Sequence, residues 1–290
     1  MADACSDGVD MGFVALGHVK VAILGVVQGI TELLPISSTA HMRIVPALLG
    51  WQDPGSAFSA AMQLAALAAV VSYFWSDVKL LVFGSLGALA RRDFANPAFK
   101  MALWIIGATV PIVIFGALLS STLNACGSPL RSLFVIGLAC IVMAVLMALA
   151  EVSAKHIRHM GDVTWRDAMI VGLAQVGALI PGVSRSGSTL TAALFLGLER
   201  EQAARFSFLL GLPAIALAGL RELYALYKAH LDAHGWSVLA VGLVVASISA
   251  FAAIWGLMRV LERFSSWPFA IYRAFIGGLL ISLVMMGVLT

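Results

Sequence analysis

Charged residues are scarce in this chain. Only 11% of its 290 residues are Asp, Glu, Lys or Arg, whereas 61% are hydrophobic; an ordinary soluble domain has about 25% charged and roughly 45–50% apolar residues. Such a chain cannot hide its apolar surface from water, and we exclude a soluble domain on that ground. The formal net charge is +3 and the basic residues are dispersed, so the expected partner is membrane lipid and not nucleic acid.

Cysteine is also rare. Cys5, Cys126 and Cys140 form no CxxC pair, and no histidine stands at metal-ligand spacing, which argues against a zinc site or a disulfide framework. Residues 1–10 contain aspartates and no basic residue. This is the wrong charge for the start of a secretory signal, and we interpret the segment as a short tail.

Long apolar runs are abundant. Crossing a hydrocarbon core takes about 20 apolar residues in a helix, and we predict six spans, at residues 58–75, 101–122, 130–150, 206–227, 236–258 and 269–289. Two more apolar segments, 18–50 and 167–197, are broken in the middle by Pro, Gly and hydroxyl residues. Lipid cannot bond free amides, so such breaks persist only inside protein or beside a wet cavity. We therefore predict two re-entrant helical hairpins.

The two broken segments share a skeleton, which indicates an internal repeat. Gly25 and Gln28 match Gly172 and Gln175; a Pro and then a Ser follow in both, and both later reach Phe-Ser, at 58–59 and 206–207. We predict one all-α integral membrane domain over 1–290, with repeat one at about 12–150 (hairpin 18–50) and repeat two at about 167–290 (hairpin 167–197). Each repeat has one hairpin and three spans. Because three is an odd number of crossings, the second copy is inverted, so the two hairpins enter from opposite faces of the membrane and meet near its midplane.

Loop charge predicts the orientation, because basic residues accumulate on the cytoplasmic side. With both termini outside, the uncharged segment 123–129 also lies outside. Twelve of the 18 Lys and Arg residues then lie inside: Lys79, Arg91, Arg92, Lys100, Lys155, Arg158, Arg166, Arg200, Arg205, Arg259, Arg263 and Arg273.

The first broken segment concentrates polar side chains. Intramembrane ionisable groups are costly and mark a functional site by default. Gln28 and Glu32 are four residues apart and share a helix face. If the helix restarts after Pro35, Ser38 and His41 also share a face, with His41 in reach of the serine hydroxyl, the pairing of nucleophile and base that covalent catalysis needs. Hydroxyls in membrane helices commonly bond only a backbone carbonyl, and that alternative stays open for Thr31 and Thr39.

The second broken segment surrounds one guanidinium, that of Arg185, with hydroxyls just before a helix restarts. Helix N-termini attract anions, and Arg offers a planar fork suited to phosphate. The expected phosphate-binding residues here are Ser184, Arg185, Ser186, Gly187, Ser188 and Thr189. The alternative is a simple helix break in which Arg185 pairs with a carboxylate such as Glu32.

The two motifs resemble those of the bacterial undecaprenyl-pyrophosphate phosphatases of the bacitracin-resistance (BacA/UppP) family. The first family motif, Glu-or-Gln-x-x-x-Glu followed by Pro-x-Ser-Ser-Thr-x-His, is matched over residues 28–41, and the second, Pro-Gly-x-Ser-Arg-Ser-x-x-Thr, over residues 181–189. Gln28 stands where other members carry Glu, which weakens the expectation of two carboxylates on a metal.

The resemblance implies hydrolysis of the terminal phosphate of C55 undecaprenyl pyrophosphate in the bacterial cytoplasmic (inner) membrane. This reaction recycles the lipid carrier for peptidoglycan synthesis and confers bacitracin resistance. Arg185 and the hydroxyls, including Ser37 and Thr39, would hold the phosphates, while a divalent cation, Mg²⁺ or Ca²⁺, near Glu32 and Gln28 shares their charge.

In that reaction Ser38 is the expected nucleophile and His41 the general base or acid. His41 as the nucleophile and direct attack by water stay open. We expect the site to open to the extracytoplasmic side, because the hairpin with most of the chemistry enters from there. Whether the protein forms a homodimer stays open as well.

A polyprenyl-phosphate flippase or transporter is the alternative function, because inverted repeats with broken helices are typical of carriers. A carrier for a phospholipid head needs an arginine but no nucleophile beside a base. The set of Ser38, His41 and Arg185 therefore favours an enzyme.

Overall fold

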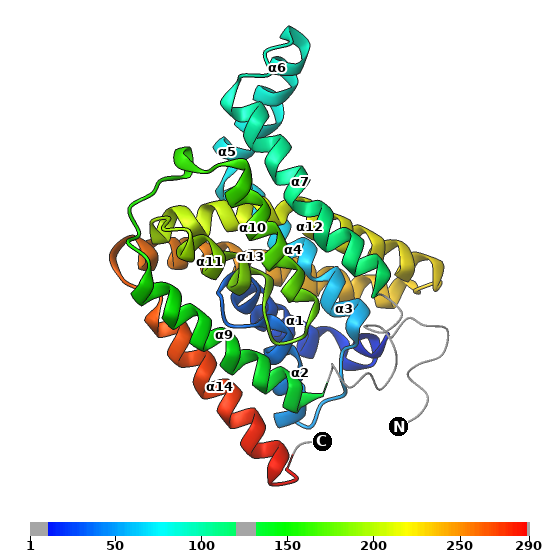
Figure 1. Cartoon of the computed structure of the whole chain (residues 1–290). Helices are drawn as coiled ribbons and strands as arrows, with labels where there is room; N and C mark the ends of the chain where they lie inside the picture. The colour runs from blue at the N-terminus through cyan, green and yellow to red at the C-terminus, as the bar shows by residue number, and fades with distance from the viewer. Residues whose placement is uncertain (1–10, 120–131, 289–290) are drawn as a thin grey trace.

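The computed structural model of the chain describes residues 11–119 and 132–288, and these are almost entirely helical (Figure 1). Cys5, Cys126 and the predicted outer segment 123–129 lie outside the described residues, whereas Cys140 is a buried thiol. The helices are α1 (Gly12–Leu33), α2 (Ser38–Leu48), α3 (Ser56–Ala61), α4 (Gln63–Tyr73), α5 (Trp75–Lys79), the π-helix η2 (Leu80–Gly84), α6 (Ser85–Arg91), α7 (Pro97–Leu118), α9 (Leu133–Ser153), η4 (Met160–Asp162), α10 (Trp165–Val176), η5 (Gly177–Leu179), α11 (Arg185–Phe195), α12 (Arg200–Lys228), α13 (Ala233–Arg263) and α14 (Trp267–Met285).

Within the described residues, six helices are long and apolar enough to cross a membrane: α1, α7, α9, α12, α13 and α14. The last five coincide with predicted spans. The remaining helix is α1. The first limb of the predicted hairpin at 18–50 is therefore itself long enough to cross a membrane, and it begins at Gly12.

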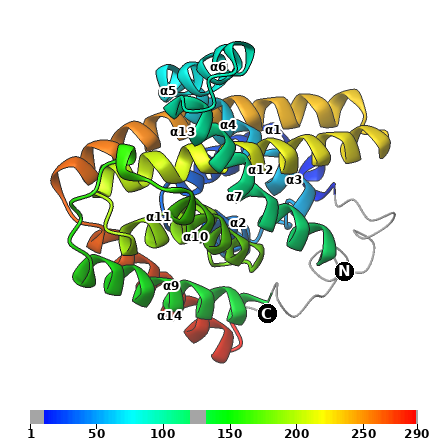
Figure 2. The same cartoon turned by 45° about the horizontal axis from the view of Figure 1, so that its top comes forward.

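The prediction of a simple span at 58–75 needs correction. The chain runs through α3 and α4, turns by 86° at Phe74 and continues as α5 to α6. At the turn Phe74 packs into the core, and Asp77 of α5 forms an ion pair with Arg205 of α12. The continuing helix, with α6 at its tip, projects away from the body in Figures 1 and 2.

The two broken segments lie inside the bundle. In Figure 2, α12 and α13 lie on one side and α9 and α14 on the other, with α2, α10 and α11 between them. Their contacts require small residues. A Cβ at Gly25 of α1 would lie 2.9 Å from the carbonyl oxygen of Gly242 in α13, and one at Gly172 of α10 would overlap Ala108 of α7.

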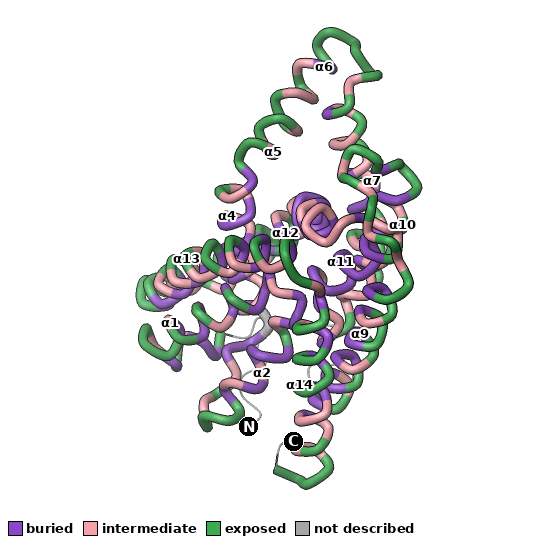
Figure 3. Tube along the Cα trace, turned by 90° about the vertical axis from the view of Figure 1, so that its left-hand side faces the viewer, coloured by how far each residue is buried: buried purple, intermediate pink, exposed green. Residues whose placement is uncertain are grey.

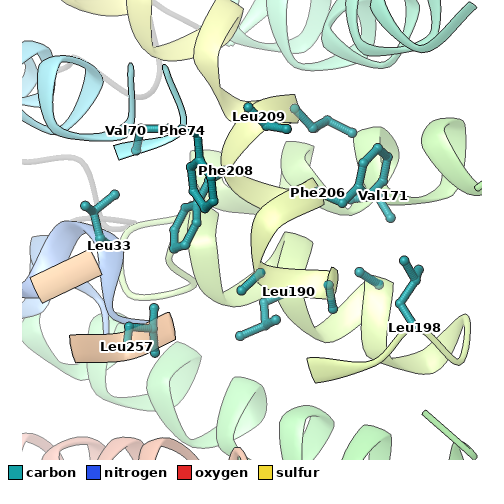
Figure 4. Packing of buried hydrophobic residues seen from close by; sticks show 14 of the residues in the cluster. Leu33, Val70, Phe74, Val171, Leu190, Leu198, Phe206, Phe208, Leu209 and Leu257 are labelled. Carbon is teal, nitrogen blue, oxygen red and sulfur yellow. The ribbon is translucent and has the colours of Figure 1, made fainter. Parts of the chain in front are cut away.

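The core lies along α12. Phe206, Phe208 and Leu209 of this helix form one buried cluster with Phe74 and, from other parts of the chain, Leu33, Val70, Val171, Leu190, Leu198 and Leu257 (Figure 4). Figure 3 shows buried residues facing the interior and exposed residues on the outer faces of the helices and along α6. Many exposed residues are large and apolar, including Phe83, Leu103 and Ile248, as expected for a surface in contact with lipid.

Candidate active site

Two helix N-termini meet at the centre of the bundle, and both are built the same way. α2 starts after Ser37 (φ 72°) and α11 after Ser184 (φ 69°). Each serine caps its helix, because its hydroxyl accepts a hydrogen bond from the amide of Ala40 or of Gly187. A positive φ is energetically unfavourable for a residue with a side chain, and such backbone strain is common at functional sites.

The turns that lead into these helices, residues 34–37 (the first tip) and 180–184 (the second tip), are held together by side chains. Ser186 Oγ, just after the second tip in the first turn of α11, donates to the carbonyl oxygens of Glu32 at 3.0 Å and of Leu34 in the first tip at 3.4 Å. Arg273 of α14 donates to the carbonyl oxygen of Pro35 at 3.1 Å and to those of Gly182 and Val183 at 2.8 and 2.9 Å. The two motifs therefore form one site.

Glu32 is the centre of the polar contacts, and its side chain is only 6% exposed. Ser38 Oγ donates to its Oε2 at 2.6 Å, and Gln28 Nε2 donates to the same oxygen at 2.9 Å. The predicted shared face of Gln28 and Glu32 is confirmed. The 2.6 Å contact is in the short range of hydrogen bonds to charged acceptors.

Arg185 lies across from this carboxylate. Its Nη2 is 3.5 Å from Glu32 Oε1, an ion pair, yet neither Nη1 nor Nη2 has a hydrogen-bond partner among the described residues. The pairing that we considered as an alternative is therefore present, and it leaves the donors of the guanidinium available. The guanidinium lies directly against Gly211 of α12, where a Cβ would overlap Nη1.

His41 does not hydrogen-bond to Ser38 in the described structure, contrary to the sequence prediction. Its Nδ1 lies 2.8 Å from the Ser37 carbonyl oxygen and its Nε2 lies 2.7 Å from the Tyr272 hydroxyl. Because a carbonyl only accepts, Nδ1 carries the proton and Nε2 accepts from Tyr272. The spacing of Ser38 and His41 did place them on one helix, but the Ser38 side chain turns to Glu32 and the imidazole stacks on the Tyr272 ring, with centroids 5.7 Å apart.

The remaining hydroxyls have different partners. Ser188 and Thr189 donate to the carbonyl oxygen of Arg185 at 3.0 and 2.8 Å, so they support the helix start. Thr31 donates to the carbonyl oxygen of Val27, the alternative considered for it, whereas Thr39 is exposed. Ser37 and Ser184 are capping residues beside the carboxylate and the guanidinium.

A cavity of about 760 Å³ reaches Thr39, in the first turn of α2, and Pro181 of the second tip. One wall is polar and comes from α2 to α4, with Arg43, Asp53 and Gln63. The lining residues from α7, η5 and α12 are apolar except Arg221: Ile112, Val113, Gly116, Ala117, Ala178, Leu179, Ala214, Leu217 and Ala218. A cavity with one polar and one apolar wall suits an amphiphilic ligand.

Two residues of the site, Tyr272 and Arg273, were not predicted from the sequence. Arg273 was counted among the cytoplasmic loop residues, and this was wrong: its side chain is fully buried beside both tips. A guanidinium within the apolar run 269–289 was the signal available, because ionisable residues inside membrane spans face the protein interior.

Comparison with known proteins identifies the family of the chain. The family model described as "Bacitracin resistance protein BacA" matches residues 21–279. The chain belongs to this family. It is 74% identical over 260 residues to undecaprenyl-diphosphatase 2 of Mesorhizobium japonicum, covering 90% of this chain and 98% of that protein. It is 47% identical to the undecaprenyl-diphosphatase of Synechococcus elongatus (93% and 94% covered) and 48% identical to that of Gloeobacter violaceus (94% of each).

The matched part of this BacA-family chain includes both tips, the cavity walls and the α14 residues Tyr272 and Arg273. It also includes all six helices that are long enough to cross a membrane, at least in part. The chain is thus a multi-pass membrane protein with one central polar site.

Proposed function

We infer that the chain is an undecaprenyl-diphosphatase, which hydrolyses C55 undecaprenyl pyrophosphate to undecaprenyl phosphate and inorganic phosphate. The observation that carries this inference is the contact of Ser38 with Glu32 opposite the unbonded guanidinium donors of Arg185. The relatives carry the same activity in their names. A hydroxyl, a carboxylate and an arginine fork, with a cavity that reaches Thr39 next to Ser38, suit a phosphoanhydride on a lipid.

Charge in the site favours an anion. Two buried guanidiniums, of Arg185 and Arg273, belong to the site, and among the described residues only that of Arg185 pairs with a carboxylate, Glu32. The N-termini of α2 and α11 add partial positive charge at the same place. A pyrophosphate would balance this excess, and Arg185 can bind its oxygens bidentately.

The chemical step that we propose is attack by Ser38 Oγ on the terminal phosphorus. The bond from this phosphorus to the bridging oxygen breaks, undecaprenyl phosphate leaves with the electron pair, and the Ser38 proton passes to Glu32 Oε2. Water then hydrolyses the phosphoserine to free the phosphate. His41 is the second candidate for proton transfer, but its Nε2 would first have to leave the Tyr272 hydroxyl.

The residues present fit a divalent cation with oxygen ligands. Gln28 Oε1 is buried without a hydrogen-bond partner among the described residues, and it lies beside the Glu32 carboxylate. Mg²⁺ commonly binds one or two protein oxygens together with substrate phosphates, and Ca²⁺ also takes oxygen ligands. Glu32 and Gln28 would hold such an ion, which would neutralise phosphate charge when bound.

We also propose that the fold is an inverted repeat, with α1, α2, α4, α7 and α9 corresponding to α10, α11, α12, α13 and α14. The helix contacts support it: α1 packs on α13 as α10 packs on α7, and α4 contacts α13 as α12 contacts α7. Two further contacts, of α4 with α12 and of α9 with α14, each join a helix to its own counterpart in the other repeat. The matching caps at Ser37 and Ser184 are in line with this correspondence.

With the N-terminus outside, we propose that the site opens to the extracytoplasmic side. In that topology the C-terminal halves of α7 and α12 lie in the outer half of the membrane. The cavity is lined by Ile112 to Ala117 of α7 and Ala214 to Arg221 of α12, which supports an outward opening.

Release of phosphate from C55 undecaprenyl pyrophosphate by the purified protein tests the function. We expect release that stops when a chelator removes divalent cations and returns when Mg²⁺ or Ca²⁺ is restored. A flippase would instead move labelled lipid between leaflets of a proteoliposome without releasing phosphate. Turnover that is equal with and without chelator would remove the cation from the proposal.

A further inference from the structure

Arg273 is the most completely buried charged residue among those described, with 0% of its surface exposed. It belongs to α14, which contributes to neither motif. Its Nη1 donates to the first tip at Pro35, and its Nη2 donates to the second tip at Gly182 and Val183. One side chain therefore binds the backbone of both tips.

This arrangement is costly, and stability alone does not account for it. Among the described residues no carboxylate lies within ion-pair distance of Arg273, and its Nε has no hydrogen-bond partner. Burying a guanidinium without a counter-ion is energetically costly, and an apolar side chain of similar size packs as well or better. The planar fork does what an apolar side chain cannot: it fixes three carbonyl oxygens from two separate turns at one point.

We propose that Arg273 is a positioning residue of the phosphatase, and this rests on the function proposed above. Pro35 precedes Ser38 by three residues, and Val183 precedes Arg185 by two. By holding these carbonyls, the guanidinium sets the separation between the nucleophile with its carboxylate, on one helix start, and the phosphate-binding fork, on the other.

Tyr272 extends the same support from the next position of α14. Its hydroxyl holds His41 Nε2 while the Ser37 carbonyl holds Nδ1. Helix α14 thus supports the site with two neighbouring residues. Arg273 fixes the backbone of the two tips, and Tyr272 fixes the imidazole of His41.

The test is Arg273→Lys, which keeps the charge but cannot bind all three carbonyls. The matched control is Arg259→Lys, at an exposed arginine that stacks on Trp255 in α13. We expect kcat for phosphate release to fall roughly 10- to 100-fold, the order expected for a 1 Å misplacement. KM should stay within about threefold, because Arg185 and the cavity are intact.

A second readout measures the separation itself. In a cysteine-free protein, spin labels at Leu48 and Phe195, exposed at the ends of α2 and α11, report the distance between the two helices. We expect one narrow distance distribution in the wild type and in Arg259→Lys, and a shifted or broader one in Arg273→Lys. An unchanged distribution or an unchanged kcat in Arg273→Lys would overturn the proposal.

If Arg273→Lys does not fold, Gly187→Ala replaces it, because a Cβ there would lie 2.8 Å from Arg273 Nη1. Its control is Gly278→Ala, where a Cβ meets no other atom within 4 Å. The same two readouts apply, and an unchanged result again overturns the proposal. A wild type that releases no phosphate would contradict the proposed function instead, so the two failures are distinguishable.

Discussion

At the scale of single residues, the site depends on one short hydrogen bond, between Ser38 and Glu32, and on one guanidinium, that of Arg185, whose terminal nitrogens are available to a ligand. Ser38 Oγ is 2.6 Å from Glu32 Oε2, and the terminal nitrogens of Arg185 make no hydrogen bond within the described chain. The carboxylate is 3.5 Å from the guanidinium. This distance is long enough for the fork to bind phosphate oxygens without first losing a tight internal partner.

Gly211 is predicted to be essential because of the space that it leaves. A Cβ at this position would overlap Arg185 Nη1, so Gly211→Ala must displace the guanidinium although it adds one methyl group. We expect kcat/KM for phosphate release to fall at least about 10-fold, by the sensitivity of catalysis to misplaced groups. Gly278→Ala is the control; equal activity of both variants would show that the position of Arg185 is not critical.

Residue spacing predicted some of these contacts and missed others. The interval between Gln28 and Glu32 is one helical turn, so their hydrogen bond follows from helix geometry. The partner of Ser38 does not, because it depends on the positive φ of Ser37 and on the path of the first tip. The contact of His41 with Tyr272 joins residues 231 positions apart, a separation that no local pattern encodes.

At the scale of elements, hydropathy predicted helices well and their bends poorly. Five predicted spans are single helices, but the run at 58–75 turns by 86° at Phe74, which is neither Pro nor Gly. That turn is set by tertiary contacts, among them the ion pair of Asp77 with Arg205. The two breaks marked by Pro, Gly and Ser were located correctly because those residues interrupt helices locally.

The start of α10 is predicted to depend on its capping box. Thr164 Oγ1 accepts from the Asp167 amide, and Asp167 Oδ2 accepts from the Thr164 amide at 2.8 Å. Arg158 donates to the same carboxylate at 2.7 Å, and this hydrogen bond raises the pKa of the Arg158 guanidinium. We expect Thr164→Ala to lower the free energy of unfolding by about 1 kcal/mol.

Unfolding of detergent-solubilised protein measures that loss. Thr164→Ser keeps the hydroxyl and is the matched control, expected to be close to the wild type. If the serine variant loses as much stability as the alanine variant, the cap is not the cause.

At the scale of the whole molecule, the prediction concerns orientation. Twelve basic residues were assigned to the cytoplasmic side from the sequence. Burial of Arg273 in the site removes one of them, and the excess of Lys and Arg on the cytoplasmic side remains. In a cysteine-free background, we expect a cysteine at His230, between α12 and α13, to react with an impermeant reagent in intact cells. A cysteine at Asp93, after α6, should react only after lysis, and the opposite pattern would invert the topology.

The effect of Arg185 on turnover shows whether its guanidinium binds the pyrophosphate. Initial rates of phosphate release from C55 undecaprenyl pyrophosphate are compared for wild type, Arg185→Lys and the control Arg259→Lys, each shown to be folded. Lysine keeps the charge but cannot donate bidentately to a phosphate. We predict a fall of about 100-fold or more in Arg185→Lys, the size expected for loss of a charge-stabilising donor, and little change in the control. A near-normal rate in Arg185→Lys would mean that the guanidinium opposite Ser38 and Glu32 is not what binds the pyrophosphate.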